Sequence, residues 1–355
     1  MSAPDANKKK LPGQEHPEKN EDEITARIIK LLKDQMLRFY GNHEKQKRQI
    51  HPKMNGCVKA EFIIEKNLPV DLKVGLFKDD KSFPAWIRFS NGNTKPLPDQ
   101  KKDIRGFAIK IMNVSGEKIV ESTIDGGNQD FIMMNTQNFV AKKLNHFYKI
   151  LKVVTTPLKS GIFFEKIFNL LGNIPILIRA GKAKIFCNHP FEMFYYSTVP
   201  YKFGVDDKAV KYAVLPSKDN ELEYTDKKNK DFLRANMAAT LLKHQIVYDF
   251  FIQFQTDADK MPIEDPTVVW DSPFIKLASI RIPTQVFDTP QQNEFGDNLS
   301  FNSWHTLPEH KPLGNFNRAR KRIYKEMYEF RHEHNKIIDK EPGADANFFN
   351  DTNIN

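Results

Sequence analysis

The chain has 355 residues, of which 40% are apolar and 28 are phenylalanine, and its formal net charge is +9. This composition is enough for a sizeable core and excludes a wholly disordered protein. Cys57 and Cys187 lie far apart and form no Cys-x-x-Cys pair, which argues against a thiolate zinc site and is typical of a reducing compartment. Because no long apolar run or secretory signal is present, we expect a soluble, cytoplasmic protein.

The N-terminal part of the chain combines a charged tail with one helix. Residues 1–22 contain few apolar side chains, which predicts a disordered tail. A helix is predicted from about Asp22, because apolar residues then recur at close to helical spacing: Ile24, Ile28, Leu31, Leu32 and Phe39. A polar linker, residues 41–49, follows this helix and ends in basic side chains.

Two later blocks of the sequence have the period of β-strands. In residues 57–112, apolar and polar side chains alternate in short runs, and we expect strands at 58–64, 85–90 and 107–112. The second block has three expected strands: 210–215, 248–255 and 274–282. Alternation with turn residues between the runs favours an antiparallel sheet, and two such blocks can close into one barrel.

The segment between the two blocks, residues 141–186, is apolar and basic. From Lys142 to Lys184 it holds nine Lys/Arg residues and one acid, Glu165. Its apolar positions suit an interfacial helix on an anionic membrane: Ile162, Phe163, Phe164, Ile167, Phe168, Leu170 and Leu171. The alternative is a core-packing helix with lysines on its solvent face. Nucleic acid is not an expected partner, because no binding motif accompanies the charge.

Three ordered stretches resemble the haem-dependent catalase family. Arg48-Gln49-Ile50-His51-Pro52 is similar to the Arg-x-x-His element that carries the distal histidine. The pair 86–90 and 103–108 resembles the family's Val-Arg-Phe-Ser and Asp-x-Arg-Gly-Phe-Ala strands. The stretch 318–324 contains the Arg-x-x-x-Tyr of the proximal helix. The order and the spacing match as well, and the resemblance looks closest to the small catalase-related branch that includes allene oxide synthase-like haem proteins.

This resemblance covers about residues 45–335 and implies a fold and a division of the chain. The fold is α+β: an antiparallel β-barrel surrounded by helices, with a C-terminal helix that carries the proximal ligand. The implied parts are a disordered tail at 1–22, a catalase-like haem domain at 23–340 and a second disordered tail at 341–355.

The resemblance implies haem b as the cofactor and Tyr324 as the ligand of its iron. The tyrosine would bind ferric iron as phenolate, and Arg320, one turn earlier on the same helix face, favours that anion. Tyr328 is a rival ligand, but the residue four positions before it is Tyr324 rather than an arginine. We therefore prefer Tyr324.

Three further arginines are expected to bind the haem propionates. Arg331 lies seven residues after Tyr324, or about 10.5 Å along a helix, which suits the reach from the iron to the porphyrin edge. Arg48 and Arg88 match the family's other propionate-binding arginines. The alternative for the C-terminal stretch is a basic, solvated helix without a ligand.

On the distal side the resemblance assigns the acid–base role to His51, with Ser90 as its hydrogen-bond partner. An imidazole can take a proton from one peroxide oxygen and return it to the other. A lone histidine after a basic stretch is otherwise an ordinary surface residue.

The family also places an amide beside the distal histidine, and here the match is poorer. The stretch 131–139 resembles the family's Asn-Asn-Thr-Pro-x-Phe-Phe, but Met134 stands at the first amide position. Asn135 is the preferred candidate, and Asn128 is the alternative if the loop shifts. Phe139 is expected to pack on the porphyrin.

The implied activity is that of an enzyme that consumes hydrogen peroxide or an organic hydroperoxide, by dismutation of hydrogen peroxide or by peroxidation of a cosubstrate. The alternative keeps the haem and rearranges or cleaves a fatty-acid (lipid) hydroperoxide. A third hypothesis is a haem-binding protein with little turnover, which the altered amide region favours. Catalases generally associate, so a homo-oligomer is a candidate assembly, and peripheral membrane contact through 141–186 is a candidate interaction.

Overall fold

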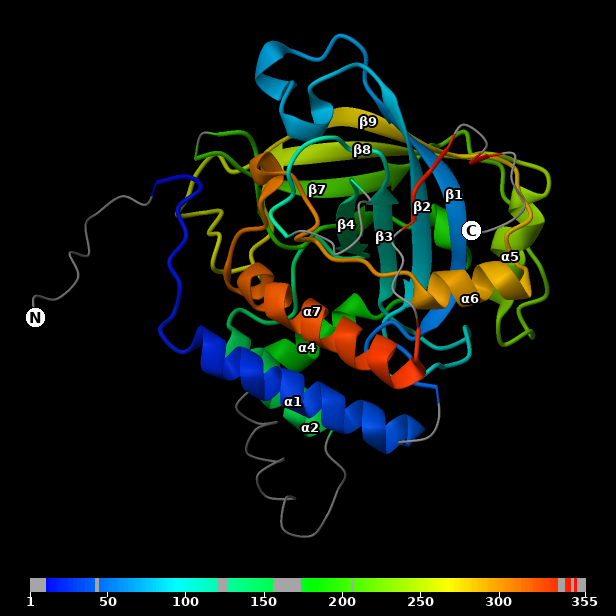
Figure 1. Ribbon diagram of the computed structural model, residues 1–355, viewed down its shortest axis with the longest axis horizontal. Coiled ribbons are helices and arrows are strands. Elements are labelled where there is room, and N and C mark those ends of the chain that lie inside the picture. Colours follow the sequence, from blue (N-terminus) through cyan, green and yellow to red (C-terminus); the bar gives the residue numbers. More distant parts are fainter. Residues whose placement is uncertain are drawn as a thin grey trace, which may run out of the picture.

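The centre of the fold is a closed antiparallel barrel (Figure 1). The computed structural model describes residues 11–41, 45–120, 127–155, 174–205, 207–337, 342–345 and 348–349. The barrel strands, in chain order, are β1 (Lys53–Ile64), β2 (Ser82–Asn91), β3 (Arg105–Ile111), β4 (Gln129–Met134), β5 (Tyr195–Tyr196), β7 (Ala209–Pro216), β8 (Ile246–Phe254) and β9 (Phe274–Ile282).

Strand pairing follows the order β5-β4-β3-β2-β1-β9-β8-β7, and a β5–β7 pairing closes the ring. The short strand β6 (Tyr201–Lys202) pairs with β7 as well. Every pairing is antiparallel. The predicted antiparallel barrel with surrounding helices is therefore confirmed.

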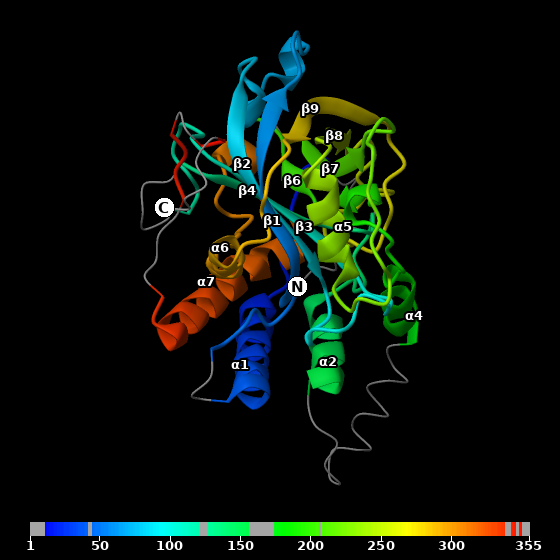
Figure 2. The same cartoon turned by 90° about the vertical axis from the view of Figure 1, so that its right-hand side faces the viewer.

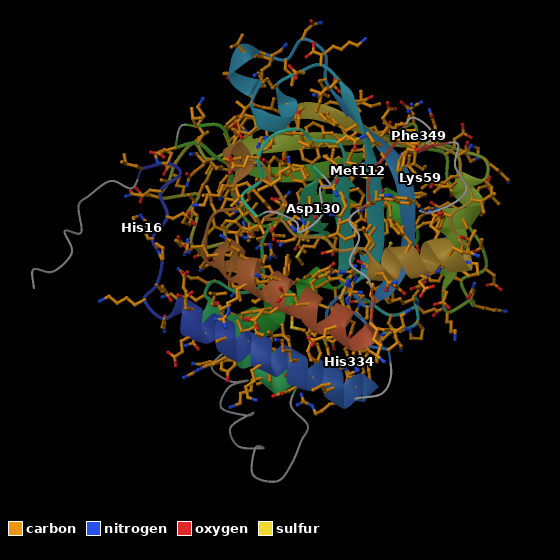
Figure 3. The ribbon with its side chains drawn as sticks, in the orientation of Figure 1. His16, Lys59, Met112, Asp130, His334 and Phe349 are labelled. Carbon is orange, nitrogen blue, oxygen red and sulfur yellow. The ribbon has the colours of Figure 1, made fainter. Side chains whose placement is uncertain are left out.

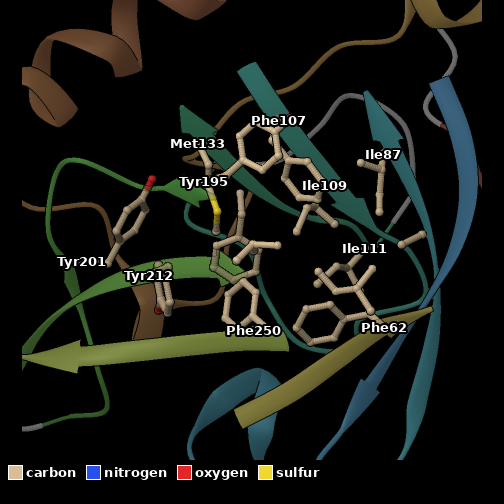
Figure 4. Close-up of a cluster of buried hydrophobic side chains, with 14 of the residues drawn as sticks. Phe62, Ile87, Phe107, Ile109, Ile111, Met133, Tyr195, Tyr201, Tyr212 and Phe250 are labelled. Atoms are coloured by element: carbon tan, nitrogen blue, oxygen red, sulfur yellow. The ribbon is translucent and has the colours of Figure 1, made fainter. Parts of the chain in front are cut away.

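Aromatic side chains fill the barrel (Figure 4). The rings of Phe62 and Phe250 meet edge to face at 5.1 Å, and those of Phe107 and Tyr195 stack at 4.7 Å. All four are almost fully buried. Burial of such a side chain contributes roughly 1.5–3 kcal/mol, so the interior is a packed core and functional groups must lie elsewhere.

Helices cover the outside of the barrel. They are α1 (Glu21–Tyr40), α2 (Leu144–Thr155), α4 (Ile174–Ala183), α5 (Phe232–Leu241), α6 (Pro290–Asn298) and α7 (Asn315–Asn335), with short 3-10 turns at Val70–Leu72, Gly75–Phe77, Pro190–Glu192 and Pro308–His310. Helix α1 packs on both α2 and α7 below the barrel (Figures 1 and 2). The helix predicted from about Asp22 is thus confirmed as α1.

None of the described helices is long and apolar enough to cross a bilayer. Residues 162–171, for which an interfacial helix is one interpretation, lie outside the described residues.

The strands expected from alternation are confirmed as β1, β2, β3, β7, β8 and β9. Strand β4 was not expected, because it begins with the polar Gln129 and Asp130. The structure buries both side chains completely or nearly so, and Lys110 Nζ on β3 contacts both Asp130 carboxylate oxygens at 3.0 Å. The ion pair between Lys110 on β3 and Asp130 on β4 thus makes a buried acidic residue compatible with a barrel strand. Figure 3 labels Asp130.

Residues 11–20, which the composition predicts to be disordered, contact the folded body of the protein. Arg318 on α7 pairs with Glu15 at 2.6 Å, with Glu21 on α1 at 2.7 Å and with Glu264 at 2.9 Å. These carboxylates raise the pKa of the Arg318 guanidinium against the opposing effect of burial. The cluster ties the N-terminal segment and α1 to the first turns of α7.

Part of the C-terminal stretch 341–355 is described, at 342–345 and 348–349. Phe348 is buried against Trp86, with the two rings edge to face at 5.5 Å. Lys59 Nζ donates a hydrogen bond to the carbonyl of Phe348. This segment therefore returns to the outer face of β1 and β2, where Figure 3 shows Lys59 and Phe349.

Candidate functional site

A cavity of about 430 Å³ lies between the outer face of β2–β4 and helix α7. Eight of the nine site residues predicted from the sequence line it: Arg48, His51, Arg88, Ser90, Phe139, Arg320, Tyr324 and Arg331. Side chains of α1 and α2 also line the cavity, and they are apolar. The fold thus brings together three motifs, the last of which follows the other two by more than 200 residues of sequence.

Strand alternation explains why the motif residues face this cavity. In β2 and β3, Phe89 and Phe107 point into the barrel, so Ser90 and Gly106 point outward. Ser90 pairs with Gly106, which in turn pairs with Met134 on β4. This row across three strands forms one wall of the cavity.

His51 lies on this wall in a strained backbone conformation. Its φ is +61°, a left-handed value that a residue with a side chain adopts at a cost of roughly 1–3 kcal/mol. Its Nδ1 lies 3.0 Å from Ser90 Oγ. The imidazole packs against Gly106, where a Cβ would stand 2.5 Å from both Cε1 and Nδ1 of His51. A glycine at the second position of β3 is therefore required here by close approach of the ring.

The surroundings of His51 disfavour its protonated form. Burial, together with the positive charges of Arg88, Arg48 and Arg320, lowers the pKa of His51 to about 3. The ring is thus held neutral, with Nδ1 engaged by Ser90. In the tautomer whose Nδ1–H donates to Ser90 Oγ, the other ring nitrogen can accept a proton.

Three arginines gather at one edge of the cavity. Their guanidinium groups donate mainly to backbone carbonyls of residues 296–299 at the end of α6: Arg88 to Gly296 at 3.2 Å, Arg331 to Asp297 at 2.5 Å and to Asn298 at 3.2 Å, and Arg48 to Leu299. The carbonyls at a helix C-terminus carry partial negative charge, which suits these cations.

Carboxylate charge does not balance this arginine cluster within the described residues. Only Asp297 comes near, at 3.8 Å from Arg88, and it is half exposed. Burial and the charges of Arg88 and Arg331 hold the pKa of Arg48 well below its usual range. Arg48 Nε is buried without a hydrogen-bond partner. Because unpaired buried cations are costly, this edge of the cavity suits a ligand that carries negative charge.

The opposite wall is helix α7. Tyr324 and Arg320 both face the cavity, and the Arg320 guanidinium lies 5.7 Å from the centre of the Phe139 ring. Arg320 Nη1 contacts Asn317 Oδ1 at 3.4 Å, and the Asn317 carbonyl accepts a hydrogen bond from Trp304 Nε1 at 2.7 Å. These contacts fix the first turns of α7 relative to the barrel.

Tyr328, the rival ligand, lines the same cavity. Its ring packs on His332 with a centroid distance of 3.9 Å, and His332 Nε2 lies 3.1 Å from the carbonyl of Asn298. Tyr328 therefore lies next to His332, which contacts both Asn298 at the end of α6 and Arg331. Tyr324, one turn earlier, stands beside Arg320.

The structure does not bring the predicted distal amide to the cavity. Asn135 Oδ1 accepts the Arg105 N–H at 2.7 Å and its Nδ2 donates to the carbonyl of Ala183 at 3.0 Å. The alternative, Asn128, donates to the carbonyl of Pro342 at 3.3 Å. Neither lines the cavity, and Met134 does. The amide of Asn135 instead connects β3 to the end of α4.

Two residues of the site were not singled out from the sequence. Gly106 belongs to the Asp-x-Arg-Gly-Phe-Ala motif, but no role was predicted for it. A glycine within a strand pattern indicates that another group approaches the backbone closely, and here that group is the His51 ring. Met134 was recognised only as a departure from the family's amide. Gln49 also lines the cavity, and its Nε2 donates to Gln35 Oε1 at 2.5 Å, so its amide is already engaged.

Comparison with known proteins gives a structural likeness. No family model matches the sequence, and no curated protein sequence matches it significantly. The structure is similar to a fungal catalase (TM-score 0.64, 18% identity, 93% of this chain and 66% of that chain), to catalase A from Saccharomyces cerevisiae (0.63, 16%, 92% and 68%) and to a bacterial catalase (0.62, 16%, 92% and 64%). The chain spans about two thirds of the length of these proteins. At these identities the likeness shows the fold, and this chain has the catalase fold.

Proposed function

We propose that this chain, which has the catalase fold, binds haem b in the cavity between β2–β4 and α7 and acts there as a peroxide-metabolising enzyme. One observation carries the proposal: the cavity has a neutral imidazole, His51, on one wall and a tyrosine, Tyr324, on the other. At one edge of the same cavity, Arg48, Arg88 and Arg331 supply the positive charge expected beside a ligand that carries carboxylates.

The residues present fit haem. The unpartnered Nε of Arg48 and the uncompensated charge beside it suit the propionates of the porphyrin, which Arg88 and Arg331 would also hold. Leu144 and Phe147 of α2 line the cavity and suit an apolar porphyrin edge. Tyr324 would ligate the iron as phenolate, favoured by Arg320 one turn away.

When bound, haem iron supplies the redox chemistry that peroxide cleavage requires. The chain's own part is proton transfer. His51 accepts a proton from one peroxide oxygen at the ring nitrogen that faces the cavity and returns it to the other oxygen. Ser90, bonded to Nδ1, holds the orientation of the ring.

The distal wall favours an organic hydroperoxide over hydrogen peroxide. Beside His51 and Gly106 it carries Ala108, Ile132 and Met134, which offer an alkyl group contacts but give peroxide no second hydrogen-bond donor. Rearrangement or cleavage of a lipid hydroperoxide, the alternative, would use the same tyrosine and histidine. The cytoplasmic location, the homo-oligomer and the limits of the haem domain stay predictions.

The proposal is tested by loading the purified protein with haem and recording its visible spectrum. Parallel assays then use hydrogen peroxide, tert-butyl hydroperoxide and a polyunsaturated fatty-acid hydroperoxide. We expect stoichiometric haem and faster turnover of the organic hydroperoxides. Rearranged lipid without a cosubstrate would favour the alternative activity. Haem binding without turnover would leave a haem-binding protein, and failure to bind haem would contradict the proposal.

Gly106→Ala should impair turnover without unfolding the protein. The added methyl overlaps the His51 ring, which must shift, and a displacement of about 1 Å near the reacting atoms can lower a rate about 100-fold. Haem content and circular dichroism should stay normal. Gly181→Ala, which adds the same methyl in open space on α4, is the matched control. Normal turnover in Gly106→Ala would show that the position of His51 does not matter.

Met134→Asn should change the preference among peroxides. An amide at this position on the wall can donate to a peroxide oxygen, and one such hydrogen bond is worth about 1 kcal/mol, or roughly fivefold in rate. We expect the ratio of kcat/KM for hydrogen peroxide to that for tert-butyl hydroperoxide to rise by this factor. Met134→Leu, which keeps the wall apolar, should leave the ratio unchanged. An equal response of both variants would argue against a role in selection.

A further inference from the structure

Helix α4 and the residues that follow it expose large apolar side chains. Ile174 is 47% exposed, Ile178 is 53% exposed and Phe186 is 64% exposed. Ile174 and Ile178 are four residues apart, so they share one face of the helix. We call these three residues, with the exposed Lys182 and Lys184 between them in sequence, the α4 patch.

The opposite face of α4 is anchored to the body of the protein. Ile176 and Ala183 are each only 3% exposed. Arg179 Nε donates to the carbonyl of Val140 at 2.8 Å, and Asn135 Nδ2 donates to the carbonyl of Ala183. The helix thus has a buried face and a distinct apolar solvent face, which a helix that only packs on a core does not need.

The patch continues across the loop before β3. Residues Asp103 and Ile185 form an isolated antiparallel bridge, which places 184–186 beside 101–103. Lys102 Nζ lies 5.1 Å from the centre of the Phe186 ring. Lys101 and Lys102 are exposed and so add two cations next to those of the patch.

Acidic residues are scarce at this surface. Residues 141–155 and 174–186 contain no Asp or Glu. Asp103, the neighbouring acid, is 2% exposed, and its carboxylate accepts hydrogen bonds from the backbone N–H groups of Asn93 and Ile104. The surface therefore combines protruding apolar side chains with positive charge that these segments do not neutralise.

We propose that the α4 patch docks the protein peripherally on an anionic lipid surface. Protruding aliphatic and aromatic side chains can enter the boundary between headgroups and acyl chains, while lysines beside them contact anionic headgroups. An anionic bilayer matches both features at once. The three apolar side chains stand on a helix and the segment after it, and each is about half exposed or more, so a fluid interface can accommodate them without a shaped partner.

Helices α1, α2 and α4 lie at the same end of the molecule (Figure 2). Docking through α4 therefore brings the end of the protein that carries α1 and α2, the apolar part of the cavity lining, toward the lipid. The docking itself does not depend on haem or turnover, so it can fail while the proposed function stands.

Sedimentation of the full-length protein with phosphatidylcholine vesicles, with and without phosphatidylserine, tests the proposal. We expect at least about tenfold more bound protein on the anionic vesicles at low salt, and a loss of that difference at high salt, because ions screen the surface field. No binding to anionic vesicles at low salt, or equal binding to neutral vesicles, would overturn it.

Two variants locate the binding surface. Ile178→Ser with Phe186→Ser removes the apolar part of the patch, and Lys182→Glu with Lys184→Glu reverses its charge; each should abolish most of the binding. The matched control changes an exposed valine and lysine elsewhere, Val70→Ser with Lys78→Glu, and should bind like wild type. Binding that survives both patch variants, or that the control loses equally, would contradict docking through α4. Circular dichroism of each variant checks folding.

Discussion

We expect Tyr324→Phe to abolish the phenolate-type absorption of the haem-loaded protein and to lower its peroxide turnover sharply. The phenylalanine ring fills the same space on α7 but has no oxygen to ligate iron. Loss of a residue that only supports a metal ligand typically costs 10- to 100-fold, so loss of the ligand itself should cost more than about 100-fold. The visible spectrum and the turnover rate measure the two effects.

Tyr328→Phe is the matched control, because Tyr328 lines the same cavity one helical turn later. Its spectrum should remain that of wild type. An unchanged spectrum in Tyr324→Phe would exclude Tyr324 as the ligand. A spectrum that is lost in Tyr328→Phe instead would assign the iron to the tyrosine that packs on His332.

His51→Ala should keep haem and its phenolate-type spectrum but lose about 10²–10⁴-fold in peroxide turnover, the usual contribution of a general acid–base residue. Among the described residues that line the cavity there is no second histidine and no carboxylate. Ser90→Ala keeps the imidazole and removes only its Nδ1 partner, so its loss should be smaller. Near-normal turnover in His51→Ala would place the acid–base group elsewhere.

The pH profile gives a second measure of the same residue. A free imidazole becomes protonated as pH falls through about 6.5. Burial, together with the charges of Arg88 and Arg48, lowers the pKa of His51 to about 3, so the base form persists below pH 6.5. We expect kcat/KM to change little as pH falls from about 8 to about 5. A decline through pH 6.5 would show that His51 titrates as an ordinary histidine.

Local sequence patterns predicted much of the fold. Alternation marked β2 and β3 because a strand places successive side chains on opposite faces, here Phe89 inward and Ser90 outward. Helical spacing marked α1 for the same kind of reason. The motifs predicted nine site residues, and the structure gathers eight of them around one cavity.

The sequence by itself thus determined which side chains share a face of each strand or helix, because those faces follow from backbone geometry alone. Only the tertiary structure decided which groups are already engaged. Asn135 has the right chemistry for the distal wall, but Arg105 and Ala183 take its hydrogen bonds. Arg48 lies close to Arg88 and Arg331, and its Nε has no hydrogen-bond partner. No sequence motif reveals either fact. Hydrogen bonding and charge balance depend on partners far away in the chain, so they become fixed only when the barrel closes.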